Sequence, residues 1–206
     1  MWSFEDKAIS KGYKYIVGVD EAGRGPLAGP VVSAAVILAR NFSCEGLTDS
    51  KLLTPLKREK FYSIITEEAV AYSTGVATTE EIENINVLQA SLLSMKRAVD
   101  NLSTSSDKKI SADYILVDGI FPIQSGTIAQ EPIIHGDSRS ISIAAASIIA
   151  KVTRDRIMGE LHLQYPCYGF DKHKGYPTKL HKEAIALYGP SPVHRKGFRG
   201  VKEFLK

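Results

Sequence analysis

Short apolar runs rich in β-branched residues mark the start of the chain. One such run begins at Tyr15 and ends in two acids, Asp20 and Glu21, after which glycines and a proline favour a turn. This pattern predicts a buried strand that carries carboxylates at its end. A second run of the same type, Val31–Leu38, follows closely enough to pair with the first one. The two runs therefore predict a hairpin-like start to a β-sheet.

Farther along the chain, apolar residues spaced three and four positions apart predict amphipathic helices. Thr54 followed by Pro55 is typical of a helix start, with an N-cap residue and then proline at the first helical position. Thr78 or Thr79 can cap a second helix, whose first turn contains two glutamates that the helix dipole favours. The apolar stripe of this second helix, which we expect to face the core, consists of Ile85, Leu88, Leu92, Met95, Val99 and Leu102.

Two further strands and one long helix complete the pattern. The segments Ala69–Ala77 and Tyr114–Asp118 predict strands, and the second of them again runs into an acid and a glycine. Residues 142 to about 165 predict one long helix, and glycines and prolines beyond it predict short helices and irregular segments. Strands that alternate with helices indicate an α/β fold. Because no repeat or linker divides the chain, we expect a single domain over residues 1–206.

The composition indicates a folded domain outside the membrane. The chain has 206 residues, of which 44% are hydrophobic and 24% charged, which excludes disorder, collagen and coiled coil. Its longest uncharged apolar run, from Ile141 to Ala150, is half the length of a membrane-spanning helix of about 20 residues. Charges among the first ten residues argue against a signal peptide, and the distant Cys44 and Cys167 fit a reducing compartment. We therefore expect a cytoplasmic protein with no membrane partner.

Charge is distributed unevenly along the chain, although the net charge is only +3. Residues 151–206 contain 12 Lys and Arg against 5 Asp and Glu, whereas residues 1–150 contain 14 against 18. The basic part also contains four of the five histidines and several tyrosines. A basic, aromatic surface suits a polyanion that exposes its bases, such as nucleic acid. A solvated basic face is the alternative explanation.

Four carboxylates stand where an apolar run ends or a helix begins, and α/β folds place their sites at such positions. They are Asp20, Glu21, Asp118 and Asp137. If the strands that end at Asp20 and Asp118 are neighbours, these like charges converge and need a cation to remain ionised together. Oxygen ligands suit Mg²⁺ or Mn²⁺, and the sequence has no Cys/His cluster of the kind that binds zinc. Because consecutive residues of a strand point to opposite faces, Asp20 and Glu21 can share one site only if the strand ends there. Taken singly, each acid can also be a cap, turn or surface residue.

The glycines that follow the first two acids do not form a nucleotide-binding motif. Their spacing from Gly23 to Gly29 matches neither a dinucleotide fingerprint nor a phosphate loop, which continues with Lys and then Ser or Thr. We therefore expect no nucleotide cofactor. Glycines on both sides of Arg24 can instead bring backbone amides and a guanidinium against a sugar-phosphate, because no side chain projects from the neighbouring Cα atoms.

Seven segments together resemble the bacterial ribonuclease HII family, and the resemblance covers nearly the whole chain, from about residue 15 to 198. The segments are Gly18-Val-Asp-Glu-Ala-Gly-Arg-Gly-Pro-Leu-Ala-Gly-Pro30, Asp49-Ser-Lys51, Val117-Asp-Gly119, Gly136-Asp-Ser138, Ala144-Ala-Ala-Ser-Ile-Ile-Ala-Lys-Val-Thr-Arg-Asp155, His173-Lys-Gly-Tyr176 and His194-Arg195. One departure is Gly197, where the family commonly has serine.

The resemblance implies a ribonuclease H-like fold, in which a central mixed β-sheet is flanked by helices. It implies that residues of about 166–206 form a basic C-terminal extension that binds substrate. By the same resemblance, Asp20, Glu21, Asp118 and Asp137 match the catalytic acids that hold two Mg²⁺ or Mn²⁺ ions. Six further residues match substrate-binding positions of the family: Gly23, Arg24, Gly25, Lys51, Lys174 and Tyr176.

The activity implied by the resemblance is that of a metal-dependent endoribonuclease. We expect it to hydrolyse the phosphodiester on the 5′ side of a ribonucleotide, in RNA/DNA hybrids or in duplex DNA with embedded ribonucleotides. The expected products carry 3′-hydroxyl and 5′-phosphate ends, and we expect the enzyme to act as a monomer. One alternative is a metal-dependent nuclease without ribonucleotide specificity, which would also cleave an all-DNA duplex. Another is a non-catalytic duplex-binding protein, which would cleave nothing.

Overall fold

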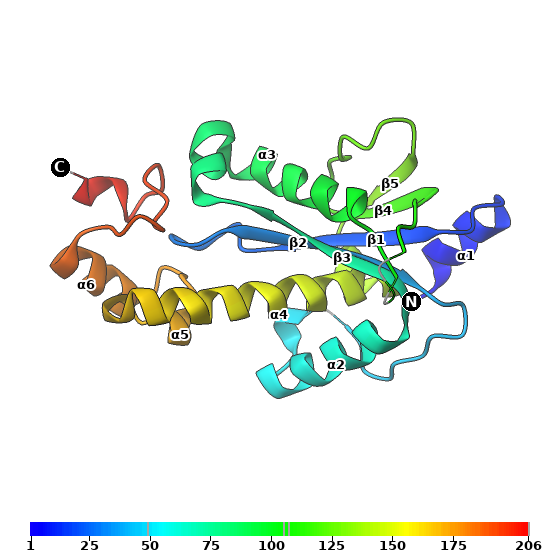
Figure 1. Cartoon of the computed structure of the whole chain (residues 1–206), viewed down its shortest axis with the longest axis horizontal. Helices are drawn as coiled ribbons and strands as arrows, with labels where there is room; N and C mark the ends of the chain where they lie inside the picture. Colours follow the sequence, from blue (N-terminus) through cyan, green and yellow to red (C-terminus); the bar gives the residue numbers. More distant parts are fainter. Residues whose placement is uncertain (49, 105, 107, 206) are drawn as a thin grey trace.

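A five-stranded mixed sheet lies between layers of helices in the computed structural model of this chain (Figure 1). The structure describes residues 1–48, 50–104, 106 and 108–205. The strands lie in the order β3-β2-β1-β4-β5. Their bounds are β1 (Ile16–Ala22), β2 (Val31–Leu38), β3 (Ala69–Ala77), β4 (Tyr114–Asp118) and β5 (Ala129–Ile133). The predicted α/β architecture is confirmed.

The sheet contains the predicted hairpin-like start and three pairings that the sequence does not specify. β1 is antiparallel to β2, which confirms the hairpin-like start, and β2 is antiparallel to β3. β4 is parallel to β1, so the two strands that carry the acids are neighbours. β5, parallel to β4 at the edge of the sheet, was not predicted. Its sequence is mostly polar and contains Pro132, which a sheet tolerates on an edge strand.

Ten helical segments surround the sheet in the described residues. The α-helices are α1 (Ser3–Ser10), α2 (Pro55–Glu68), α3 (Thr79–Asp100), α4 (Ile141–Gln164), α5 (Phe170–His173) and α6 (Lys179–Tyr188). Four short 3-10 helices are η1 (Ser50–Leu52), η2 (Gly136–Ser138), η3 (Pro166–Tyr168) and η4 (Lys202–Phe204). The predicted helices and the short segments after residue 165 are confirmed, whereas α1 was not predicted.

Side-chain caps start the two helices of the first half as expected. The Thr54 hydroxyl accepts a hydrogen bond from the Lys57 backbone at the start of α2, and Thr78 forms a capping box with Glu81 at the start of α3. The prediction of one continuous apolar stripe on α3 is wrong at its beginning. Asn86 has a φ of 66°, which kinks the helix and leaves Ile85 exposed.

Helices cover both faces of the sheet, so β2 is buried along its whole length. α4 packs against one face of β1 and β2, and α3 packs against the other face of β2 and β3 (Figure 1). The side chains of β2 alternate accordingly, with Ala34 and Val36 in the core beside α4 and Ala35 and Ile37 in the core beside α3. This two-sided packing fixes the end of β1, where the first two acids lie.

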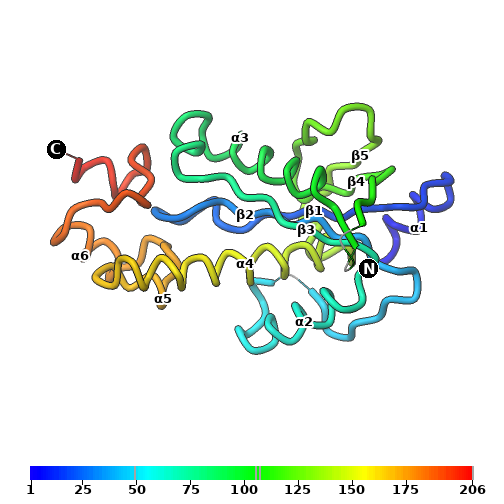
Figure 2. The backbone as a smooth tube through the Cα atoms, viewed as in Figure 1, coloured from blue at the N-terminus to red at the C-terminus, as the bar shows by residue number. Residues whose placement is uncertain are grey.

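The C-terminal segment after α4 packs at the end of the sheet where the chain turns from β1 to β2 (Figure 2). Its core contains Met158 of α4, Phe170 of α5 and Leu27 of the β1–β2 connection. Two buried histidines join its elements, since His181 Nε2 lies 3.0 Å from His194 Nε2. The connection is thus held between the body of the domain and its C-terminal segment. None of the described helices is long and apolar enough to cross a membrane.

Candidate metal centre and substrate loop

The candidate centre forms where β1 and β4 stop pairing. Their parallel ladder runs from Ile16 opposite Tyr114 to Val19 opposite Val117. The next residues on the two strands, Asp20 and Asp118, therefore meet just past the last pair. β1 continues to Ala22 through its pairing with β2, whereas β4 ends at Asp118. An opening bordered by carboxylates results at this position.

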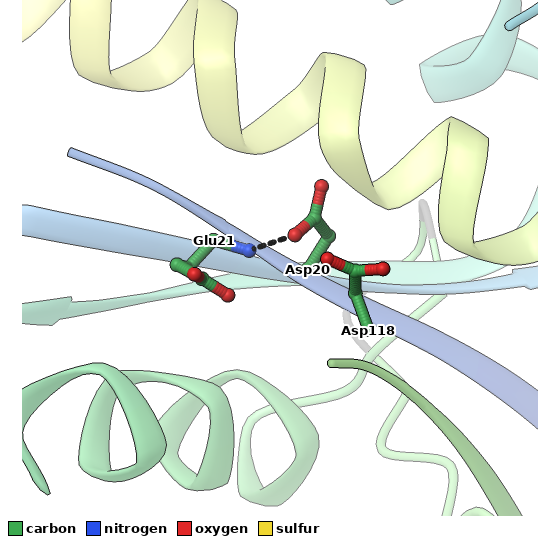
Figure 3. A group of neighbouring side chains, drawn as sticks. All are labelled: Asp20, Glu21 and Asp118. Carbon is green, nitrogen blue, oxygen red and sulfur yellow. Dashed lines mark hydrogen bonds between the residues drawn. The ribbon is translucent and has the colours of Figure 1, made fainter. Parts of the chain in front are cut away.

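Three acids converge in this opening (Figure 3). Asp20, Glu21 and Asp118 each offer one carboxylate oxygen, and these oxygens all lie within 4.8 Å of one another. Asp20 and Glu21 leave β1 on opposite sides, as strand geometry requires. The expectation that β1 must end at these residues is wrong. It is β4 that ends, and the space beside β1 lets both side chains approach Asp118.

Burial and mutual repulsion disfavour the charged forms of these acids. Asp20 is only 3% exposed, and its burial, followed by the charges of Glu21 and Asp118, raises its pKa well above the usual range. Burial is also the main reason why the pKa of Glu21 rises to about 7, against the opposing effect of the Arg24 guanidinium. The pKa of Asp118 is raised by burial and then by the nearby charge of Asp137. A cation placed among these oxygens would relieve the repulsion.

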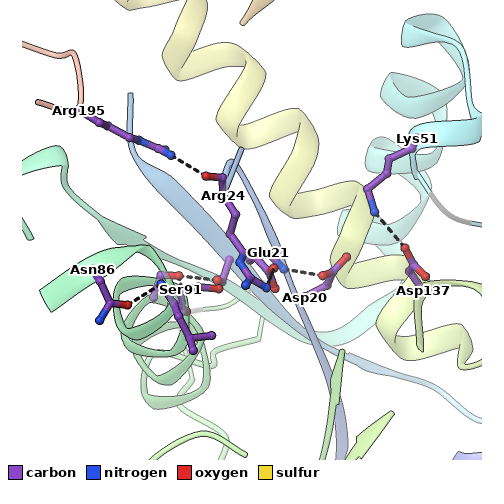
Figure 4. A network of polar contacts seen from close by, with 11 residues as sticks. Asp20, Glu21, Arg24, Lys51, Asn86, Ser91, Asp137 and Arg195 are labelled. Atoms are coloured by element: carbon purple, nitrogen blue, oxygen red, sulfur yellow. Dashed lines mark hydrogen bonds and ion pairs between the residues drawn. The ribbon is translucent and has the colours of Figure 1, made fainter. Parts of the chain in front are cut away.

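Asp137 lies outside the group of three but is connected to it. It belongs to η2, and the backbone N–H of its neighbour Gly136 donates a 2.7 Å hydrogen bond to Asp118. Lys51 Nζ lies 3.4 Å from Asp137 Oδ2, so a cation already faces this fourth acid (Figure 4). The structure therefore brings three of the four predicted acids together, and η2 places the fourth, Asp137, beside them.

The donor set fits hard divalent cations. The clustered ligand atoms are all carboxylate oxygens, which Mg²⁺ and Mn²⁺ prefer, and the described residues place no cysteine or histidine in the group. The raised pKa values of Asp20 and Asp118, caused first by burial and then by neighbouring like charges, indicate that a further cation would be favourable there. Both observations agree with a metal centre.

The predicted substrate loop lies next to this centre. Gly23 and Gly25 flank Arg24, whose guanidinium donates a 3.3 Å hydrogen bond to Glu21. Tyr176, from the C-terminal segment, is close to the loop, because a Cβ added to Gly25 would lie 3.7 Å from Tyr176 Cε1. Residues far apart in the sequence thus form one surface of acids, glycine backbone and an exposed aromatic ring.

Comparisons with known proteins agree with this geometry. The family model of ribonuclease HII matches residues 17–201. The chain is 53% identical to the ribonuclease HII of Geobacter sulfurreducens over 100% of its length and 91% of that protein. It is 49% identical to the ribonuclease HII of Bacillus subtilis over 99% of its length and 77% of that protein. The chain belongs to the ribonuclease HII family.

Solved structures support the same assignment at the level of the fold. The ribonuclease H2 of Pyrococcus horikoshii superposes with a TM-score of 0.74 at 28% identity, covering 93% of this chain and 97% of that one. A Bst ribonuclease HIII in complex with Mn²⁺ has a TM-score of 0.71 at 19% identity, covering 95% and 70% of the two chains. The ribonuclease H-like fold is therefore confirmed. Ribonuclease HII enzymes are metal-dependent endoribonucleases that act on RNA/DNA hybrids and on ribonucleotides embedded in DNA.

The remaining predicted substrate residue of this ribonuclease HII chain, Lys174, lines a basic groove. The groove has a volume of about 670 Å³ and lies between α2, α4 and α5. Basic side chains outnumber acidic ones in its lining, which also includes Tyr176. The bases are Arg58, Lys151, Arg156, Lys172 and Lys174, and the acids are Glu59, Asp155 and Asp171. Lys174 also has a φ of 51°, so a strained turn precedes Tyr176. The groove and the acids are thus separate features that meet near the Gly23–Gly25 loop.

Two buried arginines next to the loop were not predicted as functional. Arg154 and Arg195 are 1% and 0% exposed, and their guanidinium groups bind backbone carbonyls rather than carboxylates. Both stand in segments that carry the family resemblance, but an arginine in a helix or a tail is usually a surface residue. Only the fold reveals that both reach the β1–β2 connection.

Proposed function

We propose that this protein hydrolyses the phosphodiester on the 5′ side of a ribonucleotide, in RNA/DNA hybrids and at single ribonucleotides within duplex DNA, and leaves 3′-hydroxyl and 5′-phosphate ends. The observation that carries the proposal is the placement of the Asp20, Glu21 and Asp118 carboxylates beside the Gly23–Gly25 loop. A cleaving centre and a ribose-sensing surface adjoin each other there.

The four acids share one task in this proposal, which is to hold the metal ions. Asp20, Glu21 and Asp118 would hold two Mg²⁺ or Mn²⁺ ions together with Asp137, which completes the centre from η2. Bound in this way, a pair of such ions supplies an activated water and neutralises charge on the phosphate. The carboxylates themselves hold the metal ions in place and do not attack the phosphate. Lys51 balances the charge of Asp137 and is exposed enough, at 75%, to contact a substrate phosphate.

Recognition of the ribonucleotide depends on its 2′-hydroxyl, the group that distinguishes RNA from DNA at one nucleotide. We assign this task to the backbone of Gly23, Arg24 and Gly25, where a substrate can approach closely because glycine has no side chain. Tyr176 offers an aromatic face, 42% exposed, against which the neighbouring sugar or base can pack.

Residues 166–206 form the substrate-binding extension in this proposal. They contribute Tyr176 to the substrate surface, and Lys172 and Lys174 to the basic groove. Contacts of lysine with phosphates do not depend on sequence, and they weaken with added salt because the counterions that binding releases from the duplex then gain less free energy. The affinity for duplex is therefore expected to fall steeply with added salt. We further propose that the enzyme acts as a monomer in the cytoplasm.

A single cleavage assay tests the function. The substrates are a DNA duplex with one internal ribonucleotide and its all-DNA twin, each incubated with Mg²⁺, with Mn²⁺ or with a chelator. We expect metal-dependent incision only on the 5′ side of the ribonucleotide, and no incision by an Asp118→Asn variant. Incision of both duplexes would replace the proposal by a nuclease without ribonucleotide specificity. Binding without incision under every condition would indicate a duplex-binding protein.

A further inference from the structure

Arg195 has a buried guanidinium that binds carbonyl oxygens of the Gly23–Gly25 loop. It lies in the C-terminal segment and is 0% exposed. Its Nη2 donates hydrogen bonds to the carbonyl oxygens of Gly23 and Gly29, at 2.6 and 2.8 Å, and its Nε donates to Gly29 at 3.0 Å. Its Nη1 donates to the Arg24 carbonyl at 2.9 Å (Figure 4). One side chain thus binds both ends of the β1–β2 connection.

Arg154 reaches the same connection from α4. Its Nε donates to the Pro30 carbonyl at 3.0 Å and its Nη2 to the Ala28 carbonyl at 3.1 Å. Its Nη1 donates to the Lys174 carbonyl at 3.0 Å, two residues before Tyr176. A single guanidinium therefore ties the end of the β1–β2 connection next to β2 to the segment that carries the tyrosine.

Neither guanidinium forms an ion pair with any carboxylate in the described part of the chain. Burial lowers the pKa of Arg154 to about 10 and that of Arg195 to about 9, so both remain charged at neutral pH. Burying two unpaired cations is unfavourable unless their donors are satisfied. Here backbone carbonyls accept hydrogen bonds from these donors. Each of these hydrogen bonds also fixes the direction of the carbonyl group that accepts it.

Fixing the carbonyls also fixes the opposite side of each peptide. The described chain has no cis peptide bond, and in a planar trans peptide the N–H points away from the carbonyl. Because the carbonyls of Gly23 and Arg24 point to Arg195, the N–H groups of Arg24 and Gly25 point away from it. Neither N–H donates a hydrogen bond to any described residue. Two backbone donors therefore remain available on the face of the loop that lies away from Arg195.

We propose that Arg195 and Arg154 are positioning residues for ribonucleotide recognition. Arg195 sets the peptide orientation of the Gly23–Gly25 loop so that its N–H groups meet the substrate, and Arg154 fixes the other end of the β1–β2 connection and the segment before Tyr176. The inference rests on the proposed function, because it assigns these N–H groups to the ribonucleotide. Neither arginine touches the substrate, since both are buried. The close fit also explains Gly23, where a Cβ would lie 2.1 Å from Arg154 Nε.

Arg195→Lys and Arg154→Lys test this inference, because lysine keeps the charge but lacks the planar fork that reaches several carbonyls at once. The measurement is the affinity of each variant for the single-ribonucleotide duplex and for its all-DNA twin, in chelator so that neither is cut. We expect the preference for the ribonucleotide to fall about tenfold, the effect of one misplaced hydrogen bond. Affinity for the all-DNA twin should change less than about twofold.

Arg97→Lys is the matched structural control. Arg97 is partly buried and also binds a backbone carbonyl, that of Val76, but it lies on α3 and pairs with Glu81. We expect it to lower the melting temperature while keeping the full preference for the ribonucleotide. Unchanged preference in both folded test variants would overturn the inference. Absence of any preference in the wild-type protein would overturn the proposed function instead.

A measurement on the wild-type protein covers the case in which the lysine variants do not fold. With ¹⁵N-labelled glycine, the Gly25 amide resonance is followed as each duplex is added in chelator. We expect the ribonucleotide duplex to shift this resonance more than the all-DNA twin does, because only the former offers a 2′-hydroxyl to the N–H. Equal shifts with the two duplexes would overturn the inference even if neither variant could be purified.

Discussion

Gly18 of β1 lies directly against Ser142 of α4, so closely that a Cβ on Gly18 would be 2.2 Å from the Ser142 carbonyl carbon. The close approach is possible because Gly18 has no side chain and because the residue of α4 that it meets, Ser142, is small. It matters for the centre, since Gly18 is two residues before Asp20 on the same face of β1. The distance between β1 and α4 therefore helps to determine where Asp20 lies.

A Gly18→Ala substitution is expected to destabilise the protein by about 1–3 kcal/mol or more, because overpacking forces the strand and the helix apart. Urea denaturation followed by circular dichroism measures this loss. Gly159→Ala, in α4 with nothing within 4 Å of the added Cβ, is the control and should stabilise by about 0.5–1 kcal/mol. Similar small effects of the two substitutions would contradict the close packing.

An Asp20→Asn substitution should separate stability from activity. Burial and like charges disfavour the ionised Asp20 carboxylate, so its removal is expected to raise the melting temperature of the metal-free protein at pH 8. Loss of this proposed metal ligand should lower cleavage by more than about 100-fold, which exceeds the effect of contacts outside the ligand set. Thermal unfolding in chelator and the duplex cleavage assay measure the two effects.

Asp100→Asn is the control for that experiment. Asp100 is exposed at the end of α3 and, among the described residues, forms an ion pair with Lys96 alone, so neither melting temperature nor cleavage should change measurably. A lower melting temperature for Asp20→Asn than for the wild-type protein, both in chelator, would argue against electrostatic repulsion within the cluster.

Metal binding is expected to release protons near neutral pH. Burial raises the pKa of Glu21 to about 7, so below this value the metal-free site binds a proton that a cation must displace. The affinity for Mn²⁺ should therefore rise as pH increases from 6 to 8 and level off above it. Isothermal titration calorimetry at pH 6.5 in two buffers of different ionisation enthalpy counts the released protons. A Glu21→Gln variant should release fewer, and equal numbers from the two proteins would place the proton elsewhere.

The sequence predicts the parts of the fold that depend on local patterns. The capped starts of α2 and α3, the apolar runs of β1, β2 and β4, and the acids of β1 and β4 are all visible in the sequence, since each is determined by neighbouring residues. β5 and the kink at Asn86 are not visible in this way. β5 forms because an already built sheet offers an edge, and its own composition with Pro132 argues against a strand.

The candidate site was predictable as a set of residues but not as an arrangement. The sequence places Asp20 and Asp118 at strand ends, yet only the pairing of β1 with β4 brings their carboxylates together. The same holds for Gly25 and Tyr176, which 151 positions of chain separate. Arg195 is the extreme case, because its burial and its carbonyl partners depend on how the C-terminal segment folds back.

Tyr176→Ala should impair recognition of the ribonucleotide more than binding of the duplex. Loss of a stacking face costs about 1–3 kcal/mol, which corresponds to a roughly 5- to 150-fold lower cleavage rate at a single embedded ribonucleotide. Affinity for the all-DNA duplex should fall much less. Tyr15→Ala removes a tyrosine of similar exposure, 44% against 42%, far from the loop, and should change neither quantity. Equal losses of cleavage rate and of affinity for the all-DNA duplex would indicate that Tyr176 contacts any duplex and does not recognise the ribonucleotide.

The buried pair His181 and His194 should make the protein less stable in mild acid. Burial lowers the pKa of both imidazoles to about 4, whereas in the unfolded chain they titrate near 6.5. Between these values the unfolded chain binds protons that the folded one does not, so this contribution to stability falls as pH falls from about 7 to 4. Glu21 acts in the opposite direction over the same range, because its pKa is raised on folding.

The test therefore measures a difference at several pH values, which is the free energy of unfolding of the wild-type protein minus that of the His194→Asn variant. We expect the difference to shrink as pH falls. A constant difference for His194→Asn would show that the buried pair does not resist protonation.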